Sequence, residues 1–144
     1  MSLLSPADRA ALAANHMTAA DATARGAQFD PVPLVKLFNP FGAATWLATE
    51  LAADGDTLFG LADLGMGSPE LGYFSLAELE AVRLPFELAI ERDRHFTSDF
   101  PLSVWAGCAR TAGSILWAET LLRRVAQGRR ARQLPSDPAP GTGG

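Results

Sequence analysis

The spacing of hydrophobic and polar positions changes along the chain, and the change predicts helices near both ends with strands between them. Residues 4–20 carry a modest apolar stripe behind Ser5 and Pro6, a pair typical of a helix start. Short apolar or alternating runs then predict strands at residues 32–38, 44–51, 57–64 and 70–76. Turn-forming residues separate these runs, among them the glycine-rich segment 65–69.

A capping signature follows the fourth predicted strand. Ser75 and Glu78 have the spacing of a capping box, which predicts a short helix beginning near Leu76. Residues 84–96 begin at a proline turn and then alternate, which predicts a fifth strand. A short helix therefore interrupts the series of strands.

A long helical pattern fills residues 101–128, with Ser103 as its expected cap. Gly113 weakens the pattern and predicts that the helix bends or divides there. Residues 129–144 are rich in Arg, Pro and Gly and have no apolar face to bury, so we expect them to be disordered and dispensable for folding. The predicted organisation is one domain over residues 1–128 and a tail over residues 129–144.

Short connections between the predicted strands favour antiparallel pairing. The expected class is therefore α+β, with a single, mostly antiparallel sheet of about five strands and the helices packed on one face. A length of 144 residues suits one such domain. The chain has no apolar run of about 18 residues and no secretory signal at its start, so neither membrane insertion nor export is expected.

The charge distribution indicates which partners to expect, and the cysteine content indicates the cellular compartment. The net charge is −4, yet residues 119–144 hold five arginines and only two acidic residues, so the preceding body is distinctly acidic. An acidic body repels phosphates, which disfavours nucleic-acid binding except through the arginine-rich tail. The single cysteine, Cys108, excludes an internal disulfide and fits a cytoplasmic location.

The most specific segment is GLADLGMGSPELGYFSLAELE, residues 60–80. Together with KLFNPFGAATWLATEL before it and IERDRHF and PLSVWAGCARTAG after it, it resembles a bacterial family catalogued as domain of unknown function 2958. The resemblance covers roughly residues 3–115. It implies a small cytoplasmic α+β protein of the kind encoded on plasmids and integrative elements, and it supplies no catalytic residue.

One polar cluster could carry chemistry. Lys36, the only lysine, and Glu50, Asp63 and Glu70 each lie on a different predicted strand. If these strands are neighbours, the four side chains could share a face, where a desolvated lysine–carboxylate group could do acid–base work or bind a cation. A structural salt bridge or a solvent-facing charged surface is the competing interpretation. We expect at least one contact between Lys36 and a carboxylate.

The segment IERDRHF offers a weaker, metal-binding alternative. Glu91, Asp93 and His95 alternate along the predicted fifth strand, and their oxygen and nitrogen donors could ligate a metal. A charged edge strand that prevents aggregation explains the same pattern and is favoured. We therefore expect neither a metal nor a cofactor.

The C-terminal helical pattern suggests a partner surface. Trp117 and Leu121 lie about one helical turn apart, and Arg123 and Arg124 could form a polar rim beside them. The alternative is that these apolar residues pack inside the domain.

The preferred interpretation of the whole protein is a non-catalytic protein-interaction module that binds a protein partner or a second copy. The competing interpretation is a small enzyme or cation-binding protein that uses the lysine–carboxylate cluster.

Overall fold

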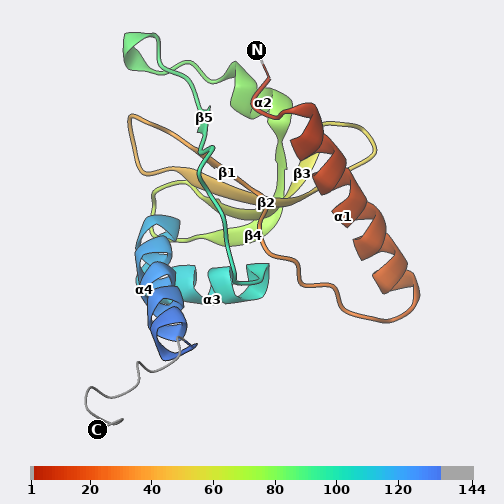
Figure 1. The fold of residues 1–144 in the computed structure, drawn as a ribbon. Helices are drawn as coiled ribbons and strands as arrows, with labels where there is room; N and C mark the ends of the chain where they lie inside the picture. Colours follow the sequence, from red (N-terminus) through yellow and green to blue (C-terminus); the bar gives the residue numbers. More distant parts are fainter. Residues whose placement is uncertain (1, 134–144) are drawn as a thin grey trace, which may run out of the picture.

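One five-stranded sheet lies between two groups of helices in the computed structural model, which describes residues 2–133 (Figure 1). The helices of this part of the chain are α1 (Pro6–Ala24), α2 (Leu76–Ala81), α3 (Leu102–Ala112) and α4 (Ile115–Gln133), with a short 3₁₀ turn η1 (Pro85–Glu87). The strands are β1 (Val35–Phe38), β2 (Thr45–Leu51), β3 (Thr57–Asp63), β4 (Glu70–Ser75) and β5 (Glu91–Arg92). They pair antiparallel in the order β4-β3-β2-β1-β5, which confirms the α+β class and the antiparallel sheet.

Serine caps start the two helices that precede and follow the meander of strands. Ser5 Oγ accepts a hydrogen bond from Asp8 N at 3.0 Å, and the Asp8 carboxylate accepts one from Ser5 N at 3.0 Å. Ser75 Oγ accepts from Glu78 N at 3.1 Å, which confirms the predicted cap of α2. Each cap satisfies a backbone N–H group that the first helical turn cannot pair by itself.

The sheet is covered on both faces. Successive side chains of a strand point to opposite faces. One face packs against α1 and α2 through a cluster that includes Leu12, Leu37 and Trp46. The other packs against α3 and α4 through a cluster that includes Leu47 and Trp105, as the placement of the helices in Figure 1 shows. The expectation that the helices pack on one face is therefore wrong, because both sheet faces are apolar and each needs a cover.

The segment before α3 is less regular than predicted. The expected strand over residues 84–96 is reduced to the two residues of β5, after the η1 turn. Pro101, not Ser103, is the cap of α3. Gly113, with a φ of 88°, ends α3, so the predicted division of the long helix is confirmed; glycine takes this left-handed conformation without steric cost.

Helix α4 runs past the predicted domain boundary. Residues 129–133 are helical rather than disordered, and the expectation of a tail that begins at residue 129 is corrected. Two tertiary contacts hold this last turn: the Arg129 guanidinium lies 5.0 Å from the centre of the Phe100 ring, and Arg130 Nη1 lies 3.6 Å from Asp99 Oδ2. The rest of the predicted tail, residues 134–144, lies outside the described residues. Within the described range, the helices are too short or too polar to cross a bilayer.

Candidate functional site

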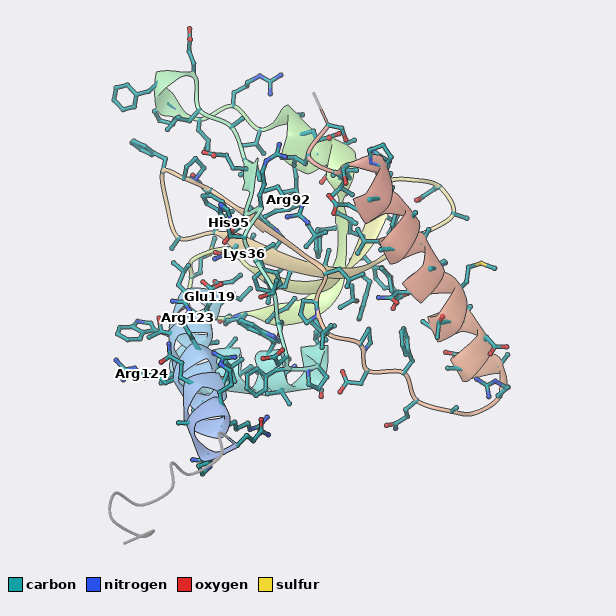
Figure 2. All side chains as sticks on the ribbon, viewed as in Figure 1. Lys36, Arg92, His95, Glu119, Arg123 and Arg124 are labelled. Atoms are coloured by element: carbon teal, nitrogen blue, oxygen red, sulfur yellow. The ribbon has the colours of Figure 1, made fainter. Side chains whose placement is uncertain are left out.

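Lys36 is the buried centre of a partly exposed ionic cluster between the sheet and α4. Its neighbours Val35 and Leu37 point to the α1 face, so the alternation of β1 turns Lys36 toward α4. Lys36 Nζ donates a hydrogen bond to Glu119 Oε1 at 2.8 Å and lies 3.6 Å from Asp93 Oδ2. Only 7% of the residue is exposed. Figure 2 shows Lys36 and Glu119 facing each other across this junction.

The two carboxylates that face Lys36 are themselves positioned by the chain. Asp93 Oδ1 accepts a hydrogen bond from His95 N at 2.9 Å, and Asp93 N donates to Lys36 O at 2.9 Å. Glu119 also lies 4.0 Å from Arg123 Nη2, one helical turn farther along α4. The resulting Lys36 cluster (Lys36, Asp93, Glu119 and Arg123) balances two positive charges with two negative ones. Its arrangement is that of a structural ion pair that ties α4 to β1, because the ammonium is committed to two carboxylates.

The other carboxylates of the predicted cluster lie elsewhere. Asp63 is fully buried, and its two oxygens accept hydrogen bonds from Gly65 N at 2.8 Å and Ile115 N at 2.9 Å. It therefore supports the β3–β4 turn and the start of α4. Glu50 lies 3.1 Å from His16 Nδ1 on α1, and Glu70 is exposed at the start of β4. Lys36 does contact carboxylates, as expected, but they are not those of Glu50, Asp63 or Glu70.

The three candidate metal ligands, Glu91, Asp93 and His95, do not form one cluster either. Because β5 ends at Arg92, Glu91, Asp93 and His95 do not alternate along one strand face. The Asp93 carboxylate faces Lys36, while Glu91 and His95 are exposed. Within residues 2–133, no three His, Cys, Asp or Glu side chains are placed to hold one metal ion.

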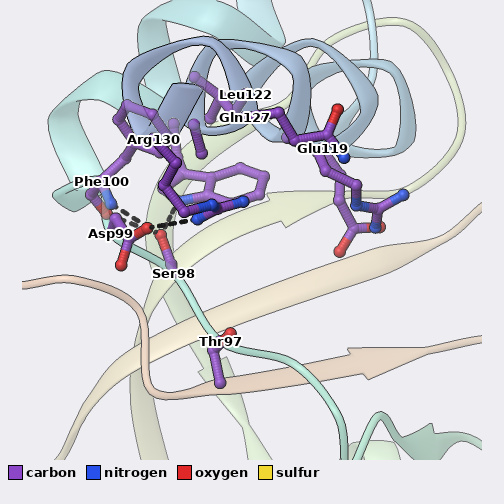
Figure 3. Close-up of a pocket in the computed structure, with 11 residues that line it drawn as sticks. Thr97, Ser98, Asp99, Phe100, Glu119, Leu122, Gln127 and Arg130 are labelled. Carbon is purple, nitrogen blue, oxygen red and sulfur yellow. Dashed lines mark hydrogen bonds and ion pairs between the residues drawn. The ribbon is translucent and has the colours of Figure 1, made fainter. Parts of the chain in front are cut away.

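A groove of about 290 Å³ lies beside the Lys36 cluster, between α4 and the segment before α3 (Figure 3). Trp105 forms part of its wall and donates from Nε1 to Ser98 Oγ at 2.7 Å. The ion pair between Asp99 and Arg130 borders the same groove. The lining residues are Thr97, Ser98, Asp99, Phe100, Trp105, Glu119, Leu122, Arg123, Ala126, Gln127 and Arg130.

Sequence reasoning missed Glu119 as the main partner of Lys36. A signal was present, since Glu119 is the only acidic residue of α4, a helix that carries five arginines. A lone lysine in an apolar strand and a lone carboxylate on a basic helix satisfy each other when the helix crosses the sheet. The spacing of 83 residues hides this pairing from any local pattern.

The outward side of α4 carries a row of exposed apolar side chains, the α4 stripe, composed of Leu116, Trp117, Leu121 and Val125. Trp117 is 63% exposed and the other three are 41–43% exposed. Trp117, Leu121 and Val125 follow one another at intervals of four residues, which aligns them along one side of the helix. An adjoining side of the helix packs into the domain through Ile115, Ala118 and Leu122. Arg123 and Arg124 are exposed on the same helix (Figure 2).

Comparison with known proteins places the chain in a family without assigning it an activity. The chain has no significant match among curated proteins or solved structures. Residues 3–116 match the family model described as "Protein of unknown function (DUF2958)", which is most of the chain. The match ends near the start of α4, so Glu119 and most of the α4 stripe follow it. The chain therefore belongs to the DUF2958 family of proteins of unknown function.

Proposed function

We propose that this protein is a cytoplasmic accessory protein of a mobile genetic element and that it acts by binding another protein rather than by catalysis. The mobile-element setting rests on the family resemblance alone. The binding role rests on one observation, the α4 stripe. Trp117, Leu121 and Val125 on three consecutive turns, together with Leu116 in the first of these turns, remain 41–63% exposed, although the same helix buries an adjoining side in a complete core. Contiguous exposed apolar surface of this kind marks interaction sites.

The charges around the stripe indicate the chemistry of the partner. Helix α4 carries five arginines, and its one carboxylate, Glu119, is engaged by Lys36. An apolar row bordered by arginines suits a partner whose apolar surface is bordered by carboxylates. Pairing of α4 with α4 of a second copy is disfavoured, because a twofold interface would bring the same arginine-rich surface against itself. The proposed occupant is therefore a different protein with an acidic rim.

The enzymatic or cation-binding alternative depends on the lysine–carboxylate residues. Its four candidates, Lys36, Glu50, Asp63 and Glu70, engage separate partners or solvent. Glu119 and Asp93 hold the Lys36 side chain as an ammonium, which has no lone pair with which to abstract a proton. The geometry thus favours the binding role over catalysis at this cluster.

The test combines cross-linking with measured affinity. A photoreactive residue introduced at Leu121 should cross-link a specific protein in the native host, which is then purified and titrated against wild-type and variant protein. Trp117→Ala should weaken binding by about tenfold or more, because exposed aromatic anchors dominate interfaces. Met66→Ala, which removes an 80% exposed side chain from the β3–β4 turn, is the matched control and should bind normally. Equal affinity of wild type and Trp117→Ala would refute the role of the stripe.

A stability measurement separates this role from a packing role. A buried tryptophan that is replaced by alanine costs about 3–5 kcal/mol. With 63% of Trp117 exposed, the cost should stay near or below about 1 kcal/mol. Loss of binding together with loss of several kcal/mol of folding stability would assign Trp117 to the core and contradict the proposal.

A further inference from the structure

The two edge strands of the sheet differ in how well they are protected from pairing with a strand of another chain. The β5 edge is two residues long, Glu91 and Arg92, and both side chains are charged. Such short, charged edges prevent pairing with other chains. The β4 edge is six residues long, ELGYFS, with one charge at its end and no proline, lysine or bulge within it. Figure 1 shows β4 as the last strand of the sheet, below β3.

The outer backbone of β4 has no partner within residues 2–133. Its ladder to β3 satisfies one side of the strand. Apart from this ladder and the cap at its last residue, the described chain makes no hydrogen bond to the β4 backbone. Two apolar side chains next to this open edge are also exposed: Leu71 at 40% and Tyr73 at 76%. Unpaired backbone groups beside exposed apolar side chains form a template for another strand.

We propose that a second copy of this chain occupies this edge, so that two β4 strands pair antiparallel and two sheets join into one of ten strands. This interface is separate from the α4 stripe and does not depend on the proposed function. A strand of a different protein could use the same backbone groups. The β4 sequence favours a second copy, because one antiparallel register of β4 against itself pairs its exposed apolar side chains with each other.

The symmetry of such a pair restricts the register. An edge strand pairs antiparallel with its own copy about a twofold axis perpendicular to the sheet, and this axis keeps each face of the sheet continuous. Side chains that lie opposite each other must therefore belong to the same face. Leu71 and Tyr73 share the α3 side of the sheet, since they pair with Leu61 and Phe59 of β3.

An axis through Gly72 satisfies these conditions. It places Leu71 of each copy opposite Tyr73 of the other, which creates two apolar cross-strand pairs from the two exposed side chains. Gly72 then faces its own copy, where the absence of side chains allows close approach; a Cβ at Gly72 would meet no atom within 4 Å. The two Glu70 carboxylates lie at opposite ends of the interface, so the only charge of β4 does not oppose itself.

A disulfide trap tests both the pairing and the register. Directly opposed antiparallel residues have Cα atoms about 4.5–5.5 Å apart, within the range of roughly 4.4–6.8 Å that a disulfide spans. Gly72→Cys, with Cys108→Ala to remove the native thiol, should therefore form a covalent dimer under mild oxidation. Glu70→Cys in the same background is the matched control, because its two copies would lie about 14 Å apart and should remain reduced.

Sedimentation equilibrium of the full chain supplies the second measurement. Wild type should dimerise with increasing concentration, and Tyr73→Lys should raise the dissociation constant by about tenfold or more, because it removes both apolar pairs and adds an edge charge. Trp117→Ala should dimerise like wild type. A monomer at all concentrations, cross-linking of Glu70→Cys but not Gly72→Cys, or a dimer disrupted by Trp117→Ala and not by Tyr73→Lys would each overturn the proposal.

Discussion

Neutralising Glu119 should destabilise the fold more than its position on a largely exposed helix suggests. Glu119→Gln removes the charge that Lys36 faces at 2.8 Å, while Lys36 itself remains 7% exposed. Breaking a buried ion pair costs about 3–5 kcal/mol when the remaining charge has no other partner. Here Asp93 remains 3.6 Å from the ammonium, and the glutamine oxygen can still accept a hydrogen bond. We therefore expect a loss of about 1.5–2.5 kcal/mol in the free energy of unfolding.

Neutralising the other member of the ion pair, Lys36, provides a matched comparison. Lys36→Met keeps the length and the apolar stem of the side chain and removes its charge. The Glu119 carboxylate left behind has an 18% exposed side chain and lies 4.0 Å from Arg123, so water and a second cation still stabilise it. This variant should cost about 1 kcal/mol or less. The double variant, Lys36→Met with Glu119→Gln, should be less destabilised than the sum of the two single variants.

Urea unfolding followed by tryptophan fluorescence would measure the four proteins of this double-mutant cycle. A Glu119→Gln variant within about 0.5 kcal/mol of wild type would refute the reasoning, because this is the range of surface substitutions without structural consequence. Strict additivity of the two single variants would refute it as well, since it would show that Lys36 and Glu119 do not stabilise each other.

Three further predictions concern local elements. Ser75→Ala should lower the free energy of unfolding by about 1 kcal/mol in urea titrations through loss of the α2 cap, and an unchanged value would contradict the cap. Burial opposes ionisation of Asp8, but hydrogen bonds, chiefly from Arg92, outweigh it and hold the pKa of its carboxyl below the ordinary 3.8. The stabilisation is thus present above about pH 3.8 and lost as the pH falls below it, so the stability deficit of Asp8→Asn at neutral pH should shrink in acid; a constant deficit would contradict this. Deleting the chain from Arg129 onward should cost about 1 kcal/mol and lower the melting temperature, because the contact with Phe100 is lost; an unchanged melting temperature would restore the boundary at residue 128.

The proposed surfaces are compatible with one another. The β4 strand is at the edge of the sheet, whereas the α4 stripe is on the outward side of a helix that covers one sheet face. Each surface has its own variants, Tyr73→Lys for β4 and Trp117→Ala for α4. Failure of one proposal would therefore leave the other intact.

Local chemistry determined the elements that the sequence predicted well. The cap at Ser75 requires only a hydroxyl three residues before a backbone N–H, and the division at Gly113 requires only a residue that tolerates positive φ. The strands β1 to β4 were visible because their apolar runs are short and separated by turn residues. These interactions join residues that are close in the chain, so the sequence alone contains them.

Tertiary structure decided where the charged residues of those strands point and what they meet. The presence of Lys36 in an apolar strand showed that it would need a partner, but not that α4 would supply Glu119 from 83 positions away. Asp63 likewise serves the start of α4, and its neighbours in sequence do not indicate this. Contacts of this kind depend on how the helices cross the sheet, which is set by the packing of two complete apolar faces.

Contacts with distant segments also accompany the two places in the second half of the chain where the predicted elements were wrong. Residues 129–133 have no apolar period of their own, yet they extend α4, and their arginines contact Phe100 and Asp99 in another segment. Residues 84–96 alternate like a strand, yet only Glu91 and Arg92 pair with β1, and a 3₁₀ turn occupies Pro85–Glu87. The sequence by itself determined which segments become the four helices and the first four strands. The packed sheet decided which charges meet, which edge stays open and how far the last helix runs, because these outcomes depend on contacts between residues distant in the chain.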